Sequence, residues 1–210
     1  EIASCLVGSE MCIRDRIMGK YYKPVFGIGI NDLDRDVTWK VDGKRVVCPF
    51  YRTWQNMLGR CYDLKFNERH PSYAECATTD QWIRLSGFEE WMLTQDWQGK
   101  QLDKDIIVSG NKLYSPDTCA FITKQLNLFV MDTAATRGEW PIGASWTKRD
   151  QAFKSEIRNP FTQRREGLGY YDNPEDAHLA WKRRKHEFAC QYANQQTDLR
   201  VAEALRTRYL

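Results

Sequence analysis

Basic residues are concentrated between Ser145 and Arg165. This segment contains six lysines and arginines and only two acids, Asp150 and Glu156. Guanidinium and ammonium groups bind phosphate oxygens, and arginine also makes paired hydrogen bonds with the edge of guanine. This segment could therefore contact the backbone and bases of a nucleic acid. An alternative stays open, in which these charges only solvate the surface of a sheet. The six residues are Lys148, Arg149, Lys154, Arg158, Arg164 and Arg165.

Strands are the elements that would position these side chains. In the run Phe153–Arg158, apolar or small residues alternate with charged ones, and similar alternation marks 144–147 and 163–168. A period of two puts one set of side chains on each face of a sheet. Turn signals at Asp150-Gln151 and Asn159-Pro160 separate the three runs. The segment therefore predicts three short antiparallel strands.

A helix is predicted directly after the third run. Asn173 is a favourable N-cap, Pro174 suits the first helical position, and Glu175 and Asp176 place acids in the first turn. The residues that follow at helical spacing are rich in small and aromatic side chains, so one helix face can lie on the sheet. They are Ala177, Ala180, Trp181, Arg184 and Phe188.

This arrangement resembles the APETALA-two/ethylene-response-factor DNA-binding domain over residues 142–188. The resemblance is carried by EIRNPFTQRREGLGYYDNPEDAHLAW. Its EIRNP corresponds to the family's EIR-D-P run, and a Leu-Gly-aromatic step and a helix start follow in order. Glu156, Arg158 and Arg165 keep the residue types of the family's contact positions. Ser145 and Thr147 stand where the family has arginines, and Gly167 where it has tryptophan. The resemblance implies a double-stranded DNA partner and a surface of Ser145, Thr147, Lys148, Arg149, Lys154, Glu156, Arg158, Gln163 and Arg165.

A second segment, Leu102–Thr123, is expected to form a strand, a Ser-Gly-Asn turn, a short strand and a helix capped by Ser115. This order resembles the ββα-metal core of HNH nucleases. With W-x-x-M-L-x-R-C-Y at Trp54–Tyr62 and the domain described above, most of the chain resembles phage-encoded HNH-type proteins, some of them mobile-element endonucleases. The resemblance implies a DNA target inside the bacterial host, and therefore a cytoplasmic location.

The HNH resemblance also implies roles for particular residues. In such a site a strand histidine is the general base, while a carboxylate and a helix residue hold one divalent metal. The matching positions are Asp103 for the carboxylate, Lys104 for the histidine, Asn111 for the connection and Thr118 for the helix ligand. Asp105 shares a strand face with Asp103 and could add a carboxylate. None of the three histidines, at positions 70, 178 and 186, restores the motif.

Three functions stay open at this stage. The first is a DNA-binding protein whose HNH-like core is catalytically degenerate and which needs no cofactor. The second is an active homing or nicking endonuclease, with Asp103 holding Mg²⁺ or another divalent metal and the same sheet targeting it. The third, a protein-interaction module, requires that the N-terminal part covers the basic face. The sequence indicates neither the DNA target nor the oligomeric state.

The whole chain is expected to be α+β. A helix after Pro49 carries Phe50, Trp54, Met57, Leu58 and Cys61 on one face, and a second is expected over 82–92, with 67–77 as a loop. Residues 1–16 resemble a translated sequencing-adapter read-through, so Met18 is the expected start. The predicted regions are an N-terminal helical, HNH-like domain at 18–131, a linker at 132–141, the sheet-and-helix domain at 142–192 and a C-terminal helix at 193–210.

Cysteine usage and hydropathy exclude several classes of protein. The five cysteines after residue 16 contain no C-x-x-C, which disfavours a zinc ribbon or a disulfide scaffold and favours buried free thiols. No apolar run approaches the length of a membrane span. The net charge of +3 is small, but residues 137–210 hold 14 basic and 10 acidic side chains, so the positive surplus lies in the C-terminal region.

Overall fold

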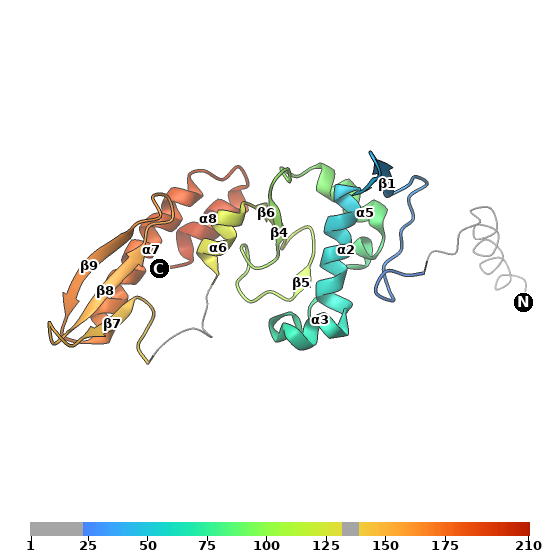
Figure 1. Ribbon diagram of the computed structural model, residues 1–210. Helices are drawn as coiled ribbons and strands as arrows, with labels where there is room; N and C mark the ends of the chain where they lie inside the picture. Colours follow the sequence, from blue (N-terminus) through green and yellow to red (C-terminus); the bar gives the residue numbers. More distant parts are fainter. Residues whose placement is uncertain (1–22, 132–138) are drawn as a thin grey trace, which may run out of the picture. The chain divides into compact units, whose positions relative to one another are not determined.

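The computed structural model describes residues 23–131 and 139–210 of the chain. The expected adapter segment, the start at Met18 and most of the expected linker lie outside the described residues. The described parts have a mixed α+β fold and form two compact units, unit 1 and unit 2, which divide between Leu93 and Thr94 (Figure 1).

Unit 1 begins with a loop and a two-stranded hairpin, and continues as a set of short helices. Its elements in chain order are β1 (Thr38–Val41), β2 (Lys44–Val47), α2 (Pro49–Tyr62), α3 (Leu64–Arg69), the 3-10 turn η1 (Pro71–Tyr73), β3 (Ala77–Thr78), α4 (Asp80–Ile83) and α5 (Leu85–Leu93).

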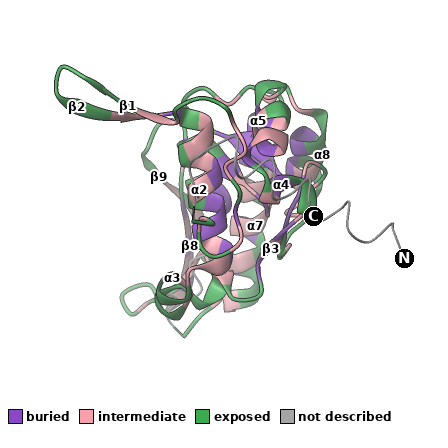
Figure 2. Cartoon of the chain, turned by 90° about the vertical axis from the view of Figure 1, so that its right-hand side faces the viewer, coloured by how far each residue is buried: buried purple, intermediate pink, exposed green. Residues whose placement is uncertain are grey.

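The predicted helix after Pro49 is confirmed as α2. Proline suits its first turn, and residues at helical spacing form one buried face, seen in purple in Figure 2. The indole Nε1 of Trp54 donates to the carbonyl of Trp82 at 2.7 Å, so this fully buried ring leaves no unsatisfied donor. Helix α5 packs against α2. The buried residues of α2 are Trp54, Met57, Leu58, Gly59 and Cys61.

Two expectations for unit 1 need correction. The second helix is interrupted at Arg84, whose backbone is extended, because the neighbouring residues Ile83 and Leu85 exchange backbone hydrogen bonds with Ile30. The expected loop at 67–77 is largely ordered into α3 and η1. Asp63 caps α3 by accepting from the backbone amides of Lys65 and Phe66.

Unit 2 contains short strands, the three-stranded sheet and three helices among its described residues. In chain order they are β4 (Gln101–Asp103), β5 (Leu113–Tyr114), β6 (Ala120–Ile122), α6 (Lys124–Val130), β7 (Ala144–Thr147), β8 (Ala152–Arg158), β9 (Arg165–Tyr171), α7 (Pro174–Ala193) and α8 (Leu199–Thr207).

The prediction that a helix starts at Ser115 is wrong. Residues 116–118 form a turn, in which the Ser115 hydroxyl accepts from the amide of Thr118, and β6 follows. Strand β6 is completely buried and pairs antiparallel with β4. The helix begins at Lys124 instead, where the Thr123 hydroxyl accepts from the amide of Leu126. Burial of β6 outweighs the local capping signal at Ser115.

The predicted three-stranded antiparallel sheet is confirmed, in the order β7-β8-β9. Helix α7 packs on all three strands (Figure 1). Along β8, Phe153, Ser155 and Ile157 are buried beneath the helix, and the Ser155 hydroxyl donates to the carbonyl of Ala177 at 2.7 Å. The side chain of Asn173 caps α7, as its sequence predicts.

The C-terminal sheet shares one hydrophobic core with the segment that resembles an HNH core. Buried residues from 106–130 meet residues of β8, α7 and α8 in a single cluster. Contacts therefore group 101–130 with the sheet, whereas the sequence predicted a domain boundary at 132–141. The cluster contains Ile106, Ala120, Ile122, Leu126, Phe129, Val130, Ile157, Phe188, Ala189, Tyr192, Ala193, Val201, Ala202 and Leu205.

Replacing Gly143 with alanine is expected to loosen the helix from the sheet. Gly143 has φ +86°, and an added Cβ would lie 2.1 Å from Cγ of Trp181. Left-handed strain and overpacking together should lower the free energy of unfolding by about 2–4 kcal/mol. Urea unfolding measures the loss. The control is Gly167→Ala, where a Cβ meets nothing within 4 Å. Equal stabilities of the two variants would contradict this packing account.

Candidate nucleic-acid interface

The sheet has one face under α7 and one open face in unit 2. Strand register assigns the open-face residues, because directly paired residues lie on the same side of a sheet. Ser145 pairs with Lys154, which pairs with Tyr170, and Arg158 pairs with Arg165. The open face is therefore Ser145, Thr147, Lys154, Glu156, Arg158, Arg165, Gly167 and Tyr170.

Tyr170 belongs to this face although the sequence pattern did not predict it. Simple alternation from Arg165 would turn Tyr170 toward the helix. A bulge between Ser155 and Glu156 shifts the register, so that Gly169 pairs with Ser155 and Gly167 with Glu156. The extra residue on β9 reverses the alternation and leaves Tyr170 exposed on the open side. A nearby glycine pair in the third strand is the available signal for such a bulge.

Glu156 bridges two cations at the middle of the open face. Its carboxylate lies 2.5 Å from Nζ of Lys154 and 2.7 Å from a guanidinium nitrogen of Arg165. The hydrogen bond from Lys154, aided by that from Arg165 and opposed by partial burial, lowers the pKa of Glu156. The Arg165 side chain is nevertheless 80% exposed. Glu156 thus orients two cations while leaving the arginine accessible.

Arg158 and Arg165 border an open hollow of about 520 Å³ at one end of the face, lined also by Glu156, Ile157 and Gln163. The Arg158 guanidinium donates to the backbone carbonyl of Gln163 at 3.2 Å. That loop is well braced, because Asn159 accepts from the amides of residues 161 and 162. The predicted contact residue Gln163 directs its amide nitrogen to the carbonyl of residue 160.

Lys148 and Arg149 lie in the turn between β7 and β8, at the other end of the face from Arg158. Arg149 makes two hydrogen bonds with its neighbour Asp150, at 3.0 and 3.3 Å, and its side chain is 82% exposed. Ser145 and Thr147 are on the adjoining strand. The structure therefore brings all nine predicted DNA-contact residues to this sheet or to the turns at its ends.

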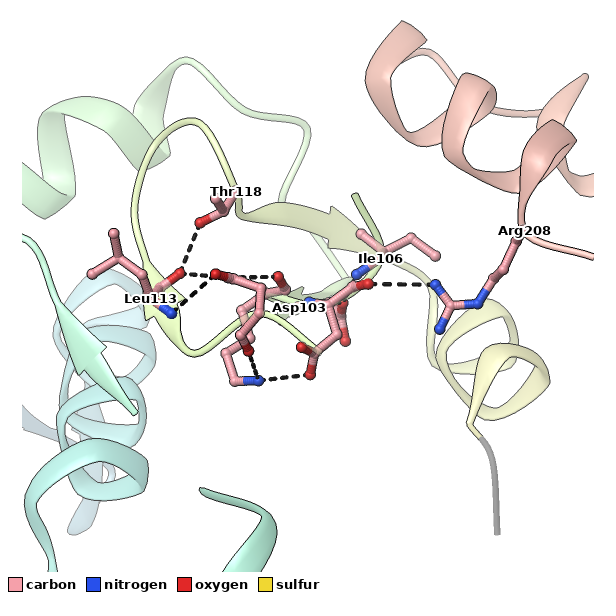
Figure 3. A network of polar contacts seen from close by, with 8 residues as sticks. Asp103, Ile106, Leu113, Thr118 and Arg208 are labelled. Carbon is pink, nitrogen blue, oxygen red and sulfur yellow. Dashed lines mark hydrogen bonds and ion pairs between the residues drawn. The ribbon is translucent and has the colours of Figure 1, made fainter. Parts of the chain in front are cut away.

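The second group of predicted site residues also comes together, as a polar network in the loop after β4 (Figure 3). Oδ1 of Asp103 accepts hydrogen bonds from the backbone amides of Asp105 and Ile106 at 2.8 and 2.6 Å. Burial, opposed by these two hydrogen bonds, raises the pKa of the Asp103 carboxyl. Asp103 therefore organises the chain as it leaves the strand.

Lys104 occupies the interior of this loop. It is 5% exposed, and its ammonium lies 2.7 Å from a carboxylate oxygen of Asp105 and 2.5 Å from the carbonyl of Asn111. The Asn111 amide in turn donates to the carbonyls of Lys104 and Leu113. The Thr118 hydroxyl donates to the same Leu113 carbonyl at 2.7 Å. These side chains close the loop upon itself.

In this arrangement the donor set does not fit a divalent metal. The oxygen Oδ1 of Asp103 already accepts two amides, and Oδ1 of Asn111 accepts the amide of Leu113. The Lys104 ammonium beside Asp105 would repel a second cation. Within 23–131 and 139–210, no three histidine, cysteine or acidic side chains cluster as metal ligands would. Burial, the main cause, also raises the pKa of the nearby Cys119 thiol to about 12, so this sulfur is a poor ligand.

Other expected features can be placed in the same described ranges. The cysteines there are free thiols; Cys190 is half-buried and the other four are buried. His178 and His186 lie on α7, outside the loop after β4, and Nδ1 of His178 is 2.8 Å from the carbonyl of Ile142. None of the described helices is long and apolar enough to cross a membrane. Comparison with protein-family models, curated proteins and solved structures finds no match to this chain.

Two substitutions of Asp103 separate a structural role from a need for its charge. A carboxyl whose folded pKa is raised costs stability as pH rises through the interval above its ordinary value, since the folded state holds the proton more tightly. Asp103→Asn keeps Oδ1 and removes that charge, so its unfolding free energy at pH 7 should match or exceed the parent's. Asp103→Ala leaves two buried amides without a partner and should lose about 1–3 kcal/mol. Equal losses in urea unfolding would contradict this role.

Proposed function

We propose that this chain binds duplex DNA with the open face of the β7–β9 sheet in the major groove. The observation that carries the proposal is a strand face, opposite α7, with exposed Arg149 at one end and exposed Arg165 at the other. The Glu156 carboxylate joins Arg165 to Lys154 on the same face. The major groove is about 12 Å wide and accepts strands as well as helices. The resemblance to the APETALA-two domain supports the same surface.

Arg158 and Arg165 are the base-reading residues of this proposal. Both flank the hollow at the end of the face, and arginine pairs with the O6 and N7 acceptors of guanine. Glu156 holds Arg165 in a defined direction before DNA arrives, which lowers the entropy lost on binding. Its carboxylate can also accept from the amino group of cytosine.

Lys148, Arg149 and Lys154 supply the phosphate contacts. The first two occupy an exposed turn, where their charge can reach the DNA backbone. Tyr170 lies across from Lys154 and can pack against a sugar. Ser145 and Thr147 provide hydroxyls instead of longer basic side chains. The β7 edge of the face therefore binds DNA more weakly than the end that carries Arg158.

Binding by this surface requires no cofactor, and the loop after β4 has a structural task in the same unit. Arg200 of α8 donates to the carbonyls of Pro116, Asp117 and Cys119 and thereby fastens that loop to the core. Following the resemblance to phage-encoded proteins, the DNA target would lie in a bacterial host cell. The contacts of the Lys104 ammonium with Asp105 and with the carbonyl of Asn111 favour binding over cleavage.

The double variant Arg158→Ala/Arg165→Ala is expected to weaken duplex binding. Each lost base contact should cost about 1–3 kcal/mol, and discrimination between sequences should fall. Fluorescence anisotropy with a selected duplex and a scrambled one, at several salt concentrations, measures both effects. Arg183→Ala/Arg206→Ala removes the same charge from α7 and α8 and is the matched control. A double variant that binds like the control would remove this face as the reading surface.

Cleavage of supercoiled plasmid tests the endonuclease alternative. The protein is expected to retard plasmid in a gel without nicking it in either Mg²⁺ or Mn²⁺, because the loop after β4 offers no metal site. Asp103→Asn and Asp103→Ala should behave like the parent in this assay. Metal-dependent nicking that disappears in Asp103→Ala, while folding and DNA binding persist, would show that the binding-only proposal is wrong.

A further inference from the structure

The β1–β2 hairpin reaches out from unit 1 as a two-stranded ribbon (Figure 2). Asp42 and Gly43 form its tip with φ +49° and +74°, the left-handed pair that a tight hairpin turn needs. A hydrogen bond of 2.8 Å from the amide of Cys48 to the carbonyl of Val37 closes its base. The ribbon is thus fixed in register and anchored directly to the start of α2.

The hairpin carries large apolar side chains that are exposed to solvent and that do not stabilise it by burial. A lone two-stranded hairpin is marginal in water, and the main contacts of β1 and β2 are with each other. Trp39 is 43% and Val41 49% exposed. A tryptophan on such an outlying ribbon is typical of a surface that a partner covers.

The two faces of the ribbon differ in chemistry. Lys40 pairs with Arg45 across the strands, so two cations stand together on one face. On the other face Trp39 pairs with Val46, and Val41 with Lys44. The tip therefore carries three cations against Asp42 and combines them with an aromatic ring. This combination matches a polyanion that also offers apolar sugar and base surfaces.

We propose that the β1–β2 hairpin is a second DNA-binding element, which enters a groove of duplex DNA. This inference rests on the proposed function of the sheet. Lys40 and Arg45 contact phosphates on either side of the groove, and Lys44 contacts a third. Trp39 and Val41 pack against sugars and thymine methyl groups on the opposite side of the ribbon.

Dimensions and charge favour duplex DNA over a protein partner. Four residues at about 3.4 Å each give a ribbon of about 14 Å, long enough to cross the depth of a groove of about 8.5 Å. The nearest acids before the ribbon, Asp34 and Asp36, precede its base, whereas the cations surround its tip. Asp42 is the one acid among residues 38–47, so the three cations leave the tip with a net charge of +2 that attracts a phosphate chain.

The test compares four proteins on a duplex long enough for both elements, with affinity measured against salt and with the protected length measured by footprinting. They are the parent, the hairpin variant Lys40→Ala/Arg45→Ala, the sheet variant Arg158→Ala/Arg165→Ala, and the control Lys65→Ala/Arg69→Ala on α3. The hairpin variant should bind about 10-fold more weakly, with a salt slope smaller by roughly 2, and should protect a shorter stretch. The control should behave as the parent does. Charge reversal to glutamate at 40 and 45 should enlarge the loss, and thermal unfolding confirms that each variant folds.

The outcomes separate the two proposals. A hairpin variant that matches the control while the sheet variant binds weakly overturns the hairpin inference and leaves the proposed function standing. A sheet variant that matches the parent overturns the proposed function, on which the hairpin inference rests. If Trp39→Ser converts a dimer to a monomer in sedimentation without changing the affinity for DNA, the hairpin joins two copies of the chain, and the inference is wrong.

Discussion

The packing of α7 on one face of β8 is the constraint from which the candidate interface follows. Phe153, Ser155 and Ile157 are buried, and Ser155 is hydrogen-bonded to the helix backbone. With alternate residues fixed beneath the helix, Lys154, Glu156 and Arg158 must point the other way. A shift of the β8 register by one residue would bury three charged side chains, and the free-energy cost of burying them would unfold the domain. The same packing that stabilises the core therefore displays the charges.

The open face has a small net charge, but ion pairs hold its charged side chains in defined positions. The whole chain has a net charge of only +3. Glu156 offsets part of the local surplus, but it also holds Arg165 and Lys154 in place, so a smaller charge is presented with a defined geometry. In the proposed DNA complex, such an arrangement favours specificity over non-specific attraction, because directional hydrogen bonds distinguish bases whereas net charge does not.

The sequence of the segment after β4 suggests one role for its polar residues, whereas their contacts in the structure suggest another. Asp103, Asn111 and Thr118 come together, but they do so around the Lys104 ammonium and the backbone groups of their own loop. Arg200 adds a fastening from α8. These contacts give the four residues a structural role within the unit that carries the sheet.

Local signals were sufficient to predict β8 and the start of α7, because alternation and an Asn-Pro cap act within a few residues. They failed at Ser115, where burial of β6 through pairing with β4 decides the outcome. The bulge that exposes Tyr170 depends on cross-strand register, which the third strand alone does not reveal. The β1–β2 hairpin was overlooked although Asp42-Gly43 is a strong turn signal. The grouping of 101–130 with the sheet depends on side chains distant in sequence.

Photo-crosslinking from the open face tests whether this face of the sheet contacts DNA. Gly167 lies opposite Glu156, and a side chain added there has free space, so p-benzoylphenylalanine can replace it. The same residue at the exposed Leu179 of α7 reports from the helix side of unit 2. A covalent adduct with duplex DNA is expected from position 167, and none is expected from position 179. Adducts from 179 with none from 167, in proteins that fold and bind DNA, would contradict this expectation.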